Sequence, residues 1–257
     1  KNNIPVVTKE LKIVGLNKLD EKINFDRLLK INDNLIAFLD INLSKVIIIN
    51  KKNEKIWSFK KEWGIEGSHP GMLMSPNDFC FFNDQIVISD TKNHRISSWT
   101  TNGELIWTWG KHAKRPHQGD GYLHYPSSLC FSIDGSKLLI VEEFERRIQI
   151  FDTNINPKDL WTRQQRIEGA HFSPFINAVD DLLVVSEPEL HKVHAFRVND
   201  SSPVLLGSWG RGGNSRDSIH EIVGIDLIKK YNLRPEVTLF KKNIPMIHDF
   251  YLQWPSD

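Results

Sequence analysis

The stretch VISDTKNHRISSW (residues 87–99) places an acid and a base five residues apart between two strand-like segments. Asp90 follows the apolar run 86–88, and Arg95 precedes the β-branched Ile96. Acids and bases are common at the ends of strands, so one instance carries little information. The spacing is informative because the rest of the chain repeats it.

Three further segments repeat the five-residue step from acid to base. They are FLDINLSKVIII (38–49), LIVEEFERRIQIF (139–151) and VVSEPELHKVHAF (184–196), with the pairs Asp40 and Lys45, Glu142 and Arg147, and Glu187 and Lys192. Each acid follows an apolar run, and the four acids are 50, 52 and 45 residues apart. Four copies at this spacing indicate an internal repeat.

Each repeat contains two more strand-like segments. An apolar segment ahead of the acid is introduced in three repeats by a proline, at Pro76, Pro126 and Pro174. Proline at the entry of a strand does the least harm to the hydrogen-bond ladder. The last segment of each repeat ends near a tryptophan, at Trp63, Trp109, Trp161 and Trp209. Four strands and one aromatic landmark per repeat predict the blades of an all-β fold, the β-propeller.

The segment ISDTKNHRI (88–96) resembles the NHL repeat, whose signature is a Gly-rich loop, a proline, an apolar strand and the pattern V-x-D-x-x-N-x-R-I. The segments 40–49, 142–151 and 187–196 are diverged copies of it, so the resemblance covers about residues 24–210. It implies that residues 1–257 form a single NHL-like propeller domain with four-stranded blades. Five blades are counted, whereas the family more often has six.

The two ends of the chain lack a clean repeat. Residues 211–257 contain strand-like runs without the acid-to-base step, and residues 4–16 read as one or two strands with no blade of their own. In propellers the first and last strands often share a blade. We therefore expect the closing segments 1–23 and 211–257 to close the ring in this way.

The acid and the base of each repeat are interpreted as structural residues. If the acid ends one strand and the base begins the next, both lie on one short loop, where charge-assisted hydrogen bonds bridge neighbouring backbone groups or blades. Packing between blades is likewise the expected role of Trp63, Trp109 and Trp209, with the stacking of nucleic-acid bases as the alternative.

Composition limits the classes of function. Lysine and arginine number 33 against 32 acids, a formal net charge of +1, which argues against a strongly basic nucleic-acid binder but not against a local basic patch. No apolar run approaches the roughly 20 residues of a membrane span, so we expect no membrane insertion. Cys80 and Cys130 form neither a disulfide framework nor a metal finger, which favours an intracellular location. No signal-peptide pattern is present, although a chain that begins at Lys1 gives this little weight.

The predicted binding face consists of the loops between second and third strands and the loops that link the blades. Basic residues concentrate there, above all in GKHAKRPHQGDG (110–121), although acids are present too. The predicted face comprises Lys60, Lys61, His94, Lys111, His112, Lys114, Arg115, Arg163, Arg166, Arg211 and Arg216. A locally positive face attracts an acidic protein surface or RNA phosphates, and some NHL propellers are similar in binding single-stranded RNA. The alternative is a solvated face with scattered charges.

Histidines indicate an enzymatic alternative. His69, His117, His171 and His220 each lie ahead of an innermost strand, with His124 as an alternative member in the third repeat. Imidazoles that meet at the mouth of the channel hold zinc or a similar divalent ion, with a position open to water or substrate. The peptide α-amidating lyases, an NHL-like family, are similar in holding a metal with channel histidines, although they have disulfides that this chain lacks. The alternative is that these are ordinary loop histidines.

The sequence therefore predicts an interaction or scaffold propeller that binds a protein or peptide across its loop face and channel mouth, with single-stranded RNA as the second partner. No cofactor is expected for that function. The alternative is a metal-dependent lyase or hydrolase with histidines at the channel mouth. No catalytic residue is assigned, because the chain has no nucleophile elbow, P-loop or dinucleotide fingerprint.

Overall fold

The computed structural model of the protein describes residues 12–15, 24–54, 56–116, 118–119, 121–132, 135–153, 163–168, 176–179, 182–198, 203–210, 222–228, 236–241 and 248–250. Their regular structure is β, apart from the single-turn 3-10 helices Thr91–Asn93 and Pro188–Leu190. None of the helices in these ranges is long and apolar enough to cross a membrane. The described residues divide into an N-terminal unit (12–129) and a C-terminal unit (130–250).

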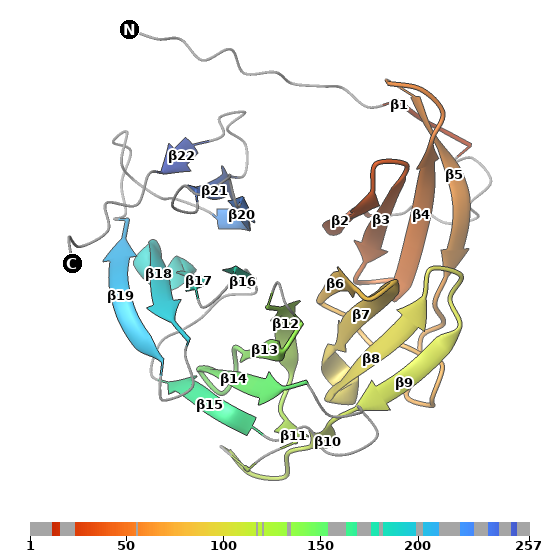
Figure 1. The fold of residues 1–257 in the computed structure, drawn as a ribbon. Helices are drawn as coiled ribbons and strands as arrows, with labels where there is room; N and C mark the ends of the chain where they lie inside the picture. The colour runs from red at the N-terminus through yellow and green to blue at the C-terminus, as the bar shows by residue number, and fades with distance from the viewer. Residues whose placement is uncertain are drawn as a thin grey trace, which may run out of the picture. The chain divides into compact units, whose positions relative to one another are not determined.

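The N-terminal unit contains two antiparallel sheets whose strands follow chain order (Figure 1). The first sheet has β2 (Arg27–Asn32), β3 (Leu35–Asp40), β4 (Lys45–Lys51) and β5 (Ile56–Trp63). The second has β6 (Asp78–Phe82), β7 (Gln85–Asp90), β8 (Arg95–Thr100) and β9 (Leu105–Trp109). A parallel two-stranded ribbon of β10 (Lys111–His112) and β11 (Tyr122–Leu123) follows β9.

The C-terminal unit repeats this architecture, with its first strand beginning in the N-terminal unit. The third sheet has β12 (Pro126–Phe131), β13 (Lys137–Glu142), β14 (Arg147–Asp152) and β15 (Arg163–Glu168). The fourth has β16 (Ile176–Val179), β17 (Leu182–Glu187), β18 (Lys192–Arg197) and β19 (Val204–Trp209). A three-stranded sheet follows, with β20 (Ile222–Ile228), β21 (Glu236–Lys241) and β22 (His248–Phe250). The predicted all-β propeller with four-stranded blades is confirmed.

The middle strands of the blades are buried on both faces. β3, β7 and β13 have five buried residues in succession, instead of the alternation of a sheet with one wet face. In the N-terminal unit, Leu39, Ile48 and Ile88 belong to one core cluster that joins the first sheet to the second. Stacking sheet upon sheet thus explains why these strands read as continuous apolar runs.

Trp63 links the first sheet to the second. Its ring centroid lies 5.1 Å from that of Trp99, with the planes 27° apart. Gly103, at φ +85°, lies so close that an added Cβ would be 2.4 Å from Trp63 Cγ. This is the packing between blades that the recurring tryptophans predict.

The third sheet departs from the tryptophan pattern. Its outer strand β15 begins at Arg163, after Trp161, so the assignment of Trp161 to the end of that strand is wrong. Ile167 lies opposite Ile148, as Trp63 lies opposite Val46 in the first sheet. A buried isoleucine therefore takes the place that tryptophan has in the other outer strands.

The N-terminal strand β1 (Lys12–Val14) does not pair with the C-terminal strands in the described residues. It pairs in parallel with β5, with Ile13 opposite Trp57, and becomes a fifth strand of the first sheet. The expectation that the first and last strands share a blade is therefore wrong for the part of the chain described. The physical reason is that β5 is an outer strand whose unpaired edge β1 covers.

Candidate functional site

The acid and base of every repeat are directly opposite each other at the end of the ladder between the second and third strands. The four pairs in register are Asp40 and Lys45, Asp90 and Arg95, Glu142 and Arg147, and Glu187 and Lys192. A loop of four residues separates each pair. The five-residue step is thus the spacing of a hairpin end.

In the second blade, Asp90 and Arg95 hold the loop that leads into the blade. Arg95 Nε donates to Asp90 Oδ2 at 2.8 Å, and Arg95 Nη2 donates to the carbonyls of His69 at 3.0 Å and Met72 at 2.7 Å. Asp90 Oδ1 accepts from the backbone N–H of Met74 at 2.7 Å. These contacts tie backbone to backbone, which is a structural role.

The other acids make comparable contacts with local variations. In the C-terminal unit, Arg147 makes a two-bond pair with Glu142, at 2.7 Å through Nε and 3.0 Å through Nη2, and both side chains are fully buried. Glu187 Oε2 lies 2.7 Å from His194 Nε2. In the N-terminal unit, Asp40 accepts from the backbone N–H of Leu43 at 2.8 Å.

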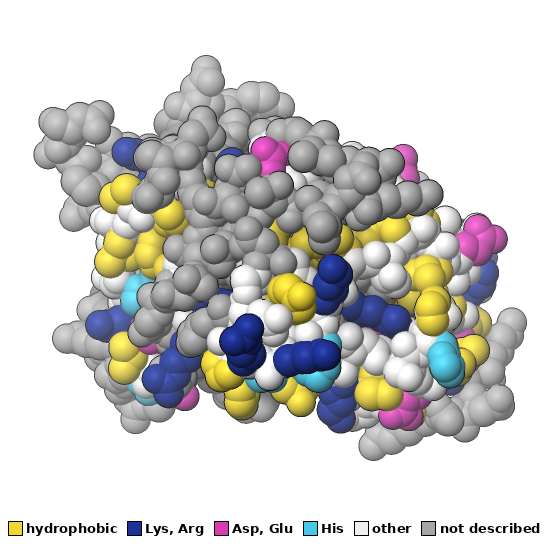
Figure 2. Space-filling model, turned by 90° about the horizontal axis from the view of Figure 1, so that it is seen from below, with side chains coloured by type: hydrophobic (Ala, Val, Ile, Leu, Met, Phe, Trp, Pro, Cys, Tyr) yellow, Lys and Arg dark blue, Asp and Glu magenta, His cyan; other side chains and the backbone are white. Residues whose placement is uncertain are grey.

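The residues of the predicted binding face do not all lie on loops. Lys111, Lys114 and Arg115 are exposed on or beside β10, and Figure 2 shows Lys and Arg side chains interspersed with hydrophobic and histidine side chains on one face. Four of the predicted residues are instead within the outer strands β5 and β15, namely Lys60, Lys61, Arg163 and Arg166. Placing these four on the loop face was wrong, because the outer strands extend through these positions. Arg211 and Arg216 lie outside the described residues.

The predicted channel histidines are largely outside the described residues. His117, His171 and His220 are among the residues not described, so the predicted metal site is not tested. His69 is exposed in the segment between β5 and β6. It is not a member of the histidine cluster found among the described residues.

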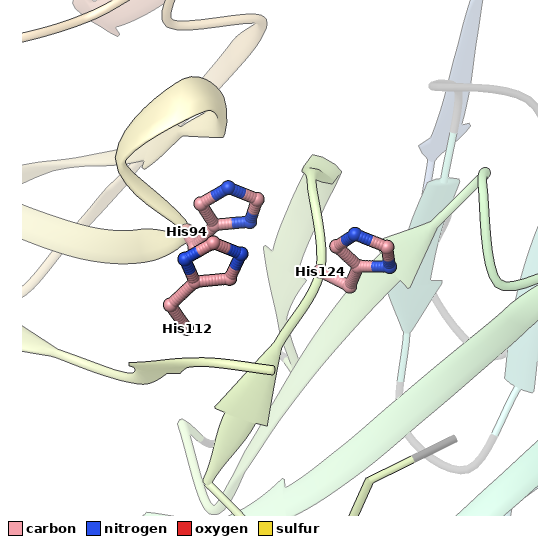
Figure 3. Close-up of side chains that lie close together, drawn as sticks. All are labelled: His94, His112 and His124. Atoms are coloured by element: carbon pink, nitrogen blue, oxygen red, sulfur yellow. The ribbon is translucent and has the colours of Figure 1, made fainter. Parts of the chain in front are cut away.

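That cluster consists of His94, His112 and His124 (Figure 3). His94 ends the loop between β7 and β8 in the left-handed conformation, with φ 53°. His112 ends β10, and His124 follows β11 directly. One potential ligand atom from each residue lies within 4.8 Å of those of the other two.

Contacts with His112 and Tyr125 hold the His94 ring. The rings of His94 and His112 stack at 3.6 Å between centroids, with 6° between their planes. The backbone N–H of Tyr125 donates to His94 Nδ1 at 3.1 Å. Burial, followed by the nearby rings of His112 and His124, lowers the pKa of His94 to about 4. His94 is therefore neutral at pH 7.

The sequence does not predict that these three histidines meet. His94 and His112 belong to the predicted binding face, and His124 is the alternative member of the predicted channel set. The parallel pairing of β10 with β11 is what brings His112 beside the residue that precedes His124. Two-residue strands have no readable periodicity, so the sequence offered no signal for this pairing.

A second feature of the N-terminal unit is a cavity of about 630 Å³ where the end of β5 meets the second sheet. Leu43, Ile65 and Trp99 contribute apolar lining, while Lys45 and Glu62 contribute charge. Two buried polar atoms on the lining residues, Trp63 Nε1 and Glu62 Oε2, have no hydrogen-bond partner among the described residues. Sequence analysis assigned no role to this cavity.

The two cysteines form no disulfide. Cys130 is buried in the core of the C-terminal unit, and Cys80 is half-buried in β6. They are core thiols in equivalent strands of two blades, consistent with the absence of a disulfide framework.

No protein-family model matches the chain, and no curated protein sequence matches it significantly. Solved structures share its fold. The β-propeller domain of Cps50 (Swd1) from Myceliophteria thermophila is 13% identical over 85% of this chain and 66% of its own, with a TM-score of 0.54. Streptogramin B lyase is 10% identical over 92% of this chain and 72% of its own, with a TM-score of 0.54. A chain of a mitotic checkpoint complex is 6% identical over 84% of this chain and 58% of its own, with a TM-score of 0.53.

These likenesses extend to the fold and no further. The similar structures include a propeller domain, a lyase and part of a protein complex, so the fold is compatible with both binding and catalysis. None of the comparisons confirms the NHL-repeat family. The chain is a β-propeller protein.

Proposed function

We propose that this propeller is a binding module for a protein or peptide and that the cavity beside Trp63 takes a segment of the partner. The pattern ISDTKNHRI (88–96) supports a further proposal, that the propeller belongs to the NHL-repeat type. The membership of a similar propeller in a mitotic checkpoint complex is compatible with a protein partner.

The observation that carries the proposal is the cavity itself, which combines the apolar Leu43, Ile65 and Trp99 with the charged Lys45 and Glu62. Buried polar groups almost always have a hydrogen-bond partner, and two lining residues each carry a buried atom without one among the described residues, Trp63 Nε1 as a donor and Glu62 Oε2 as an acceptor. A bound peptide offers a carbonyl to accept from Trp63 Nε1 and an N–H to donate to Glu62 Oε2, and it reaches these covered atoms when the lining side chains move aside.

The surroundings of the cavity suit an apolar side chain next to that peptide bond. Ile65 lines the cavity and is 65% exposed, so an apolar side chain of a partner can reach it. Leu43 and Trp99 extend the apolar lining. We therefore expect a peptide with an aliphatic or aromatic anchor residue.

The test is selection of peptides from a displayed random library on the complete chain, followed by fluorescence polarisation with the selected peptides. Trp63→Phe removes the indole N–H and keeps an aromatic ring, and we expect about fivefold to tenfold weaker binding, as for the loss of one hydrogen bond. Ile65→Asp should abolish binding. Leu205→Asp is the matched control, because Leu205 is 53% exposed on the outer strand β19.

Selected peptides that bind Trp63→Phe and Ile65→Asp as tightly as the unchanged protein would contradict the proposal. A single-stranded RNA probe in the same assay tests whether the propeller binds RNA instead of a peptide. Contacts between Lys111, Lys114 or Arg115 and phosphates lose affinity steeply between about 50 and 200 mM salt, whereas an apolar peptide anchor does not.

A metal-dependent lyase or hydrolase is the second candidate function, and the cluster of His94, His112 and His124 is the observation that favours it. A metal ion held by three histidines keeps a position open, where it lowers the pKa of bound water. The fold of streptogramin B lyase is compatible with this candidate. Support for this candidate requires two results, a metal ion bound to the protein and the turnover of a substrate.

A further inference from the structure

We infer that His94, His112 and His124 form a binding site for a transition-metal ion of the zinc class. The site is separate from the cavity beside Trp63 and uses none of the four channel histidines His69, His117, His171 and His220. It follows from where the fold places three imidazoles that are 12 to 30 residues apart in the chain (Figure 3).

The donor set points to the class of metal. Three imidazole nitrogens, with no carboxylate beside them among the described residues, suit zinc, copper, nickel or cobalt, whereas magnesium and calcium prefer oxygen ligands. A tetrahedral zinc ion with bonds of about 2.0–2.1 Å separates its ligand atoms by roughly 3.3 Å. The nitrogens of the cluster all lie within 4.8 Å of one another, so they have to approach by at most about 1.5 Å.

The side chains differ in their freedom to make that approach. His112 is exposed at the end of a two-residue strand, so its ring has room to turn, and His124 is half-buried after β11. His94 is only 6% exposed and is the anchor of the cluster. Closing around an ion requires the His112 ring to turn out of its stack with His94, because parallel rings 3.6 Å apart do not direct their nitrogen lone pairs at one point.

Binding at His94 has a consequence for the backbone of Tyr125. Since Tyr125 N–H donates to Nδ1, a neutral His94 carries its own proton on Nε2. A metal at Nδ1 displaces the Tyr125 N–H directly. A metal at Nε2 requires the ring proton to move to Nδ1, and this also removes the acceptor. In both cases metal binding breaks the hydrogen bond from Tyr125.

The site leaves at least one coordination position to water or to a small ligand, because three protein ligands meet there in the part of the chain that the structure describes. The exposure of His112 gives solvent access to that position. The expected ligand of the bound ion is thus water or a small anion that reaches it from the surface.

The first experiment uses the complete chain without a histidine tag, stripped with a chelator and titrated with zinc chloride by calorimetry. We expect one ion per chain, and we expect His112→Gln and His124→Gln each to weaken binding at least about tenfold. His69→Gln is the matched control, because it removes an exposed histidine of the same unit outside the cluster. Cobalt chloride gives an independent reading through the absorption bands of tetrahedral Co²⁺.

The second measurement follows the Tyr125 amide by NMR. Selective ¹⁵N-tyrosine labelling yields only four signals, and Tyr125→Phe assigns the relevant one. With zinc, this signal should shift and its hydrogen exchange should accelerate. Near-UV circular dichroism checks the fold of each variant. If His124→Gln does not fold, zinc binding by His112→Gln, whose substituted residue is exposed, still tests the inference.

Three results would each overturn the inference. They are the absence of stoichiometric zinc binding, a loss of affinity in His69→Gln as large as in His112→Gln, and a Tyr125 amide that zinc leaves unchanged. The last result, with binding otherwise intact, would mean that His94 is not a ligand.

Discussion

Asp78 shows how the interior of a blade changes the chemistry of a single side chain. It begins β6, where Phe79 N–H donates to its Oδ1 at 2.9 Å and the Ser128 hydroxyl donates to its Oδ2. Desolvation outweighs these hydrogen bonds and the nearby Arg27, and raises the pKa of Asp78 to about 6. The charged form is therefore disfavoured in the folded protein.

The shift predicts a pH dependence of stability. Because the pKa is higher in the folded state than the 3.8 of an ordinary Asp, the folded protein keeps a proton between about pH 4 and 6 that the unfolded chain releases. The contribution of Asp78 to the free energy of unfolding is thus greatest below pH 4 and falls as pH rises to about 6. Two pKa units correspond to about 2.7 kcal/mol, and screening at a half-buried residue reduces this to roughly 1–2 kcal/mol.

Urea unfolding of the unchanged protein and of Asp78→Asn from pH 4 to pH 7 measures this contribution. The stability of Asp78→Asn relative to the unchanged protein should rise by about 1–2 kcal/mol across that range. A constant difference at all pH values would show that Asp78 titrates alike in the folded and unfolded states. Asparagine keeps the shape of the side chain, so the comparison isolates its ionisation.

At the scale of the element, the hairpin between the second and third strands is the unit that recurs. Glu142 and Arg147 are its most buried version, and Gln149 adds a hydrogen bond to Glu142. The fold tolerates a buried ion pair whose two partners form hydrogen bonds with each other. Removing one partner leaves a buried charge without compensation, which strongly destabilises the fold. The acid-to-base step therefore keeps both charges together in this hairpin, as it does for Asp90 and Arg95 in the second blade.

Arg147→Met should destabilise the protein by about 3–5 kcal/mol, because it leaves the Glu142 carboxylate buried without its cation. The double variant Glu142→Leu with Arg147→Met should recover most of that loss, since neither charge remains. Lys30→Ala is the control, because its pair with Asp33 is exposed and we expect no measurable change. The measurement is the urea midpoint by circular dichroism. If the urea midpoint of Arg147→Met is close to that of the unchanged protein, the pair of Glu142 and Arg147 does not stabilise the fold.

Elements were predictable from the sequence where short-range patterns specify them. The apolar runs 36–39 and 138–141 and the acids that follow them predict the second strands, which the structure places at β3 and β13. The outer strands were less predictable, because each pairs with a neighbouring strand of its blade along one edge only. A single tryptophan is not enough to fix where such a strand begins and ends. The start of β15 at Arg163, after Trp161, is the example.

At the scale of the whole molecule, each unit has a hydrophobic core of its own. Ile48 is 1% exposed in a cluster of the N-terminal unit, and Ile150 is fully buried in a cluster of the C-terminal unit. Since each blade of a repeat fold contacts only its neighbours, stability is expected to be distributed among local units. We therefore expect more than one unfolding transition.

Ile48→Ala and Ile150→Ala test this expectation, each with a local loss of about 2–5 kcal/mol. Tryptophan fluorescence mainly reports the N-terminal unit, which contains Trp57, Trp63, Trp99, Trp107 and Trp109. Ile48→Ala should lower the urea midpoint of the fluorescence transition, and Ile150→Ala should affect chiefly the circular dichroism signal. If both variants shift one common transition equally, the two units unfold together and the single-domain prediction gains support.

The sequence by itself determined the blades. Strand order, the hairpin with its opposed acid and base, and the buried middle strands all follow from residues that are close together in the chain, whose hydrogen-bond register and apolar pattern are local. The resemblance of ISDTKNHRI to the NHL signature is of the same local kind.

Only the tertiary structure decided which side chains meet. The pairing of β1 with β5, the cavity beside Trp63, and the meeting of His94 with His112 and His124 join segments whose separation in the chain follows no period. Such contacts depend on how one sheet packs on the next and on a two-residue ribbon, and no pattern in a single sequence encodes these distances. The blades were therefore predictable, and the candidate site was not.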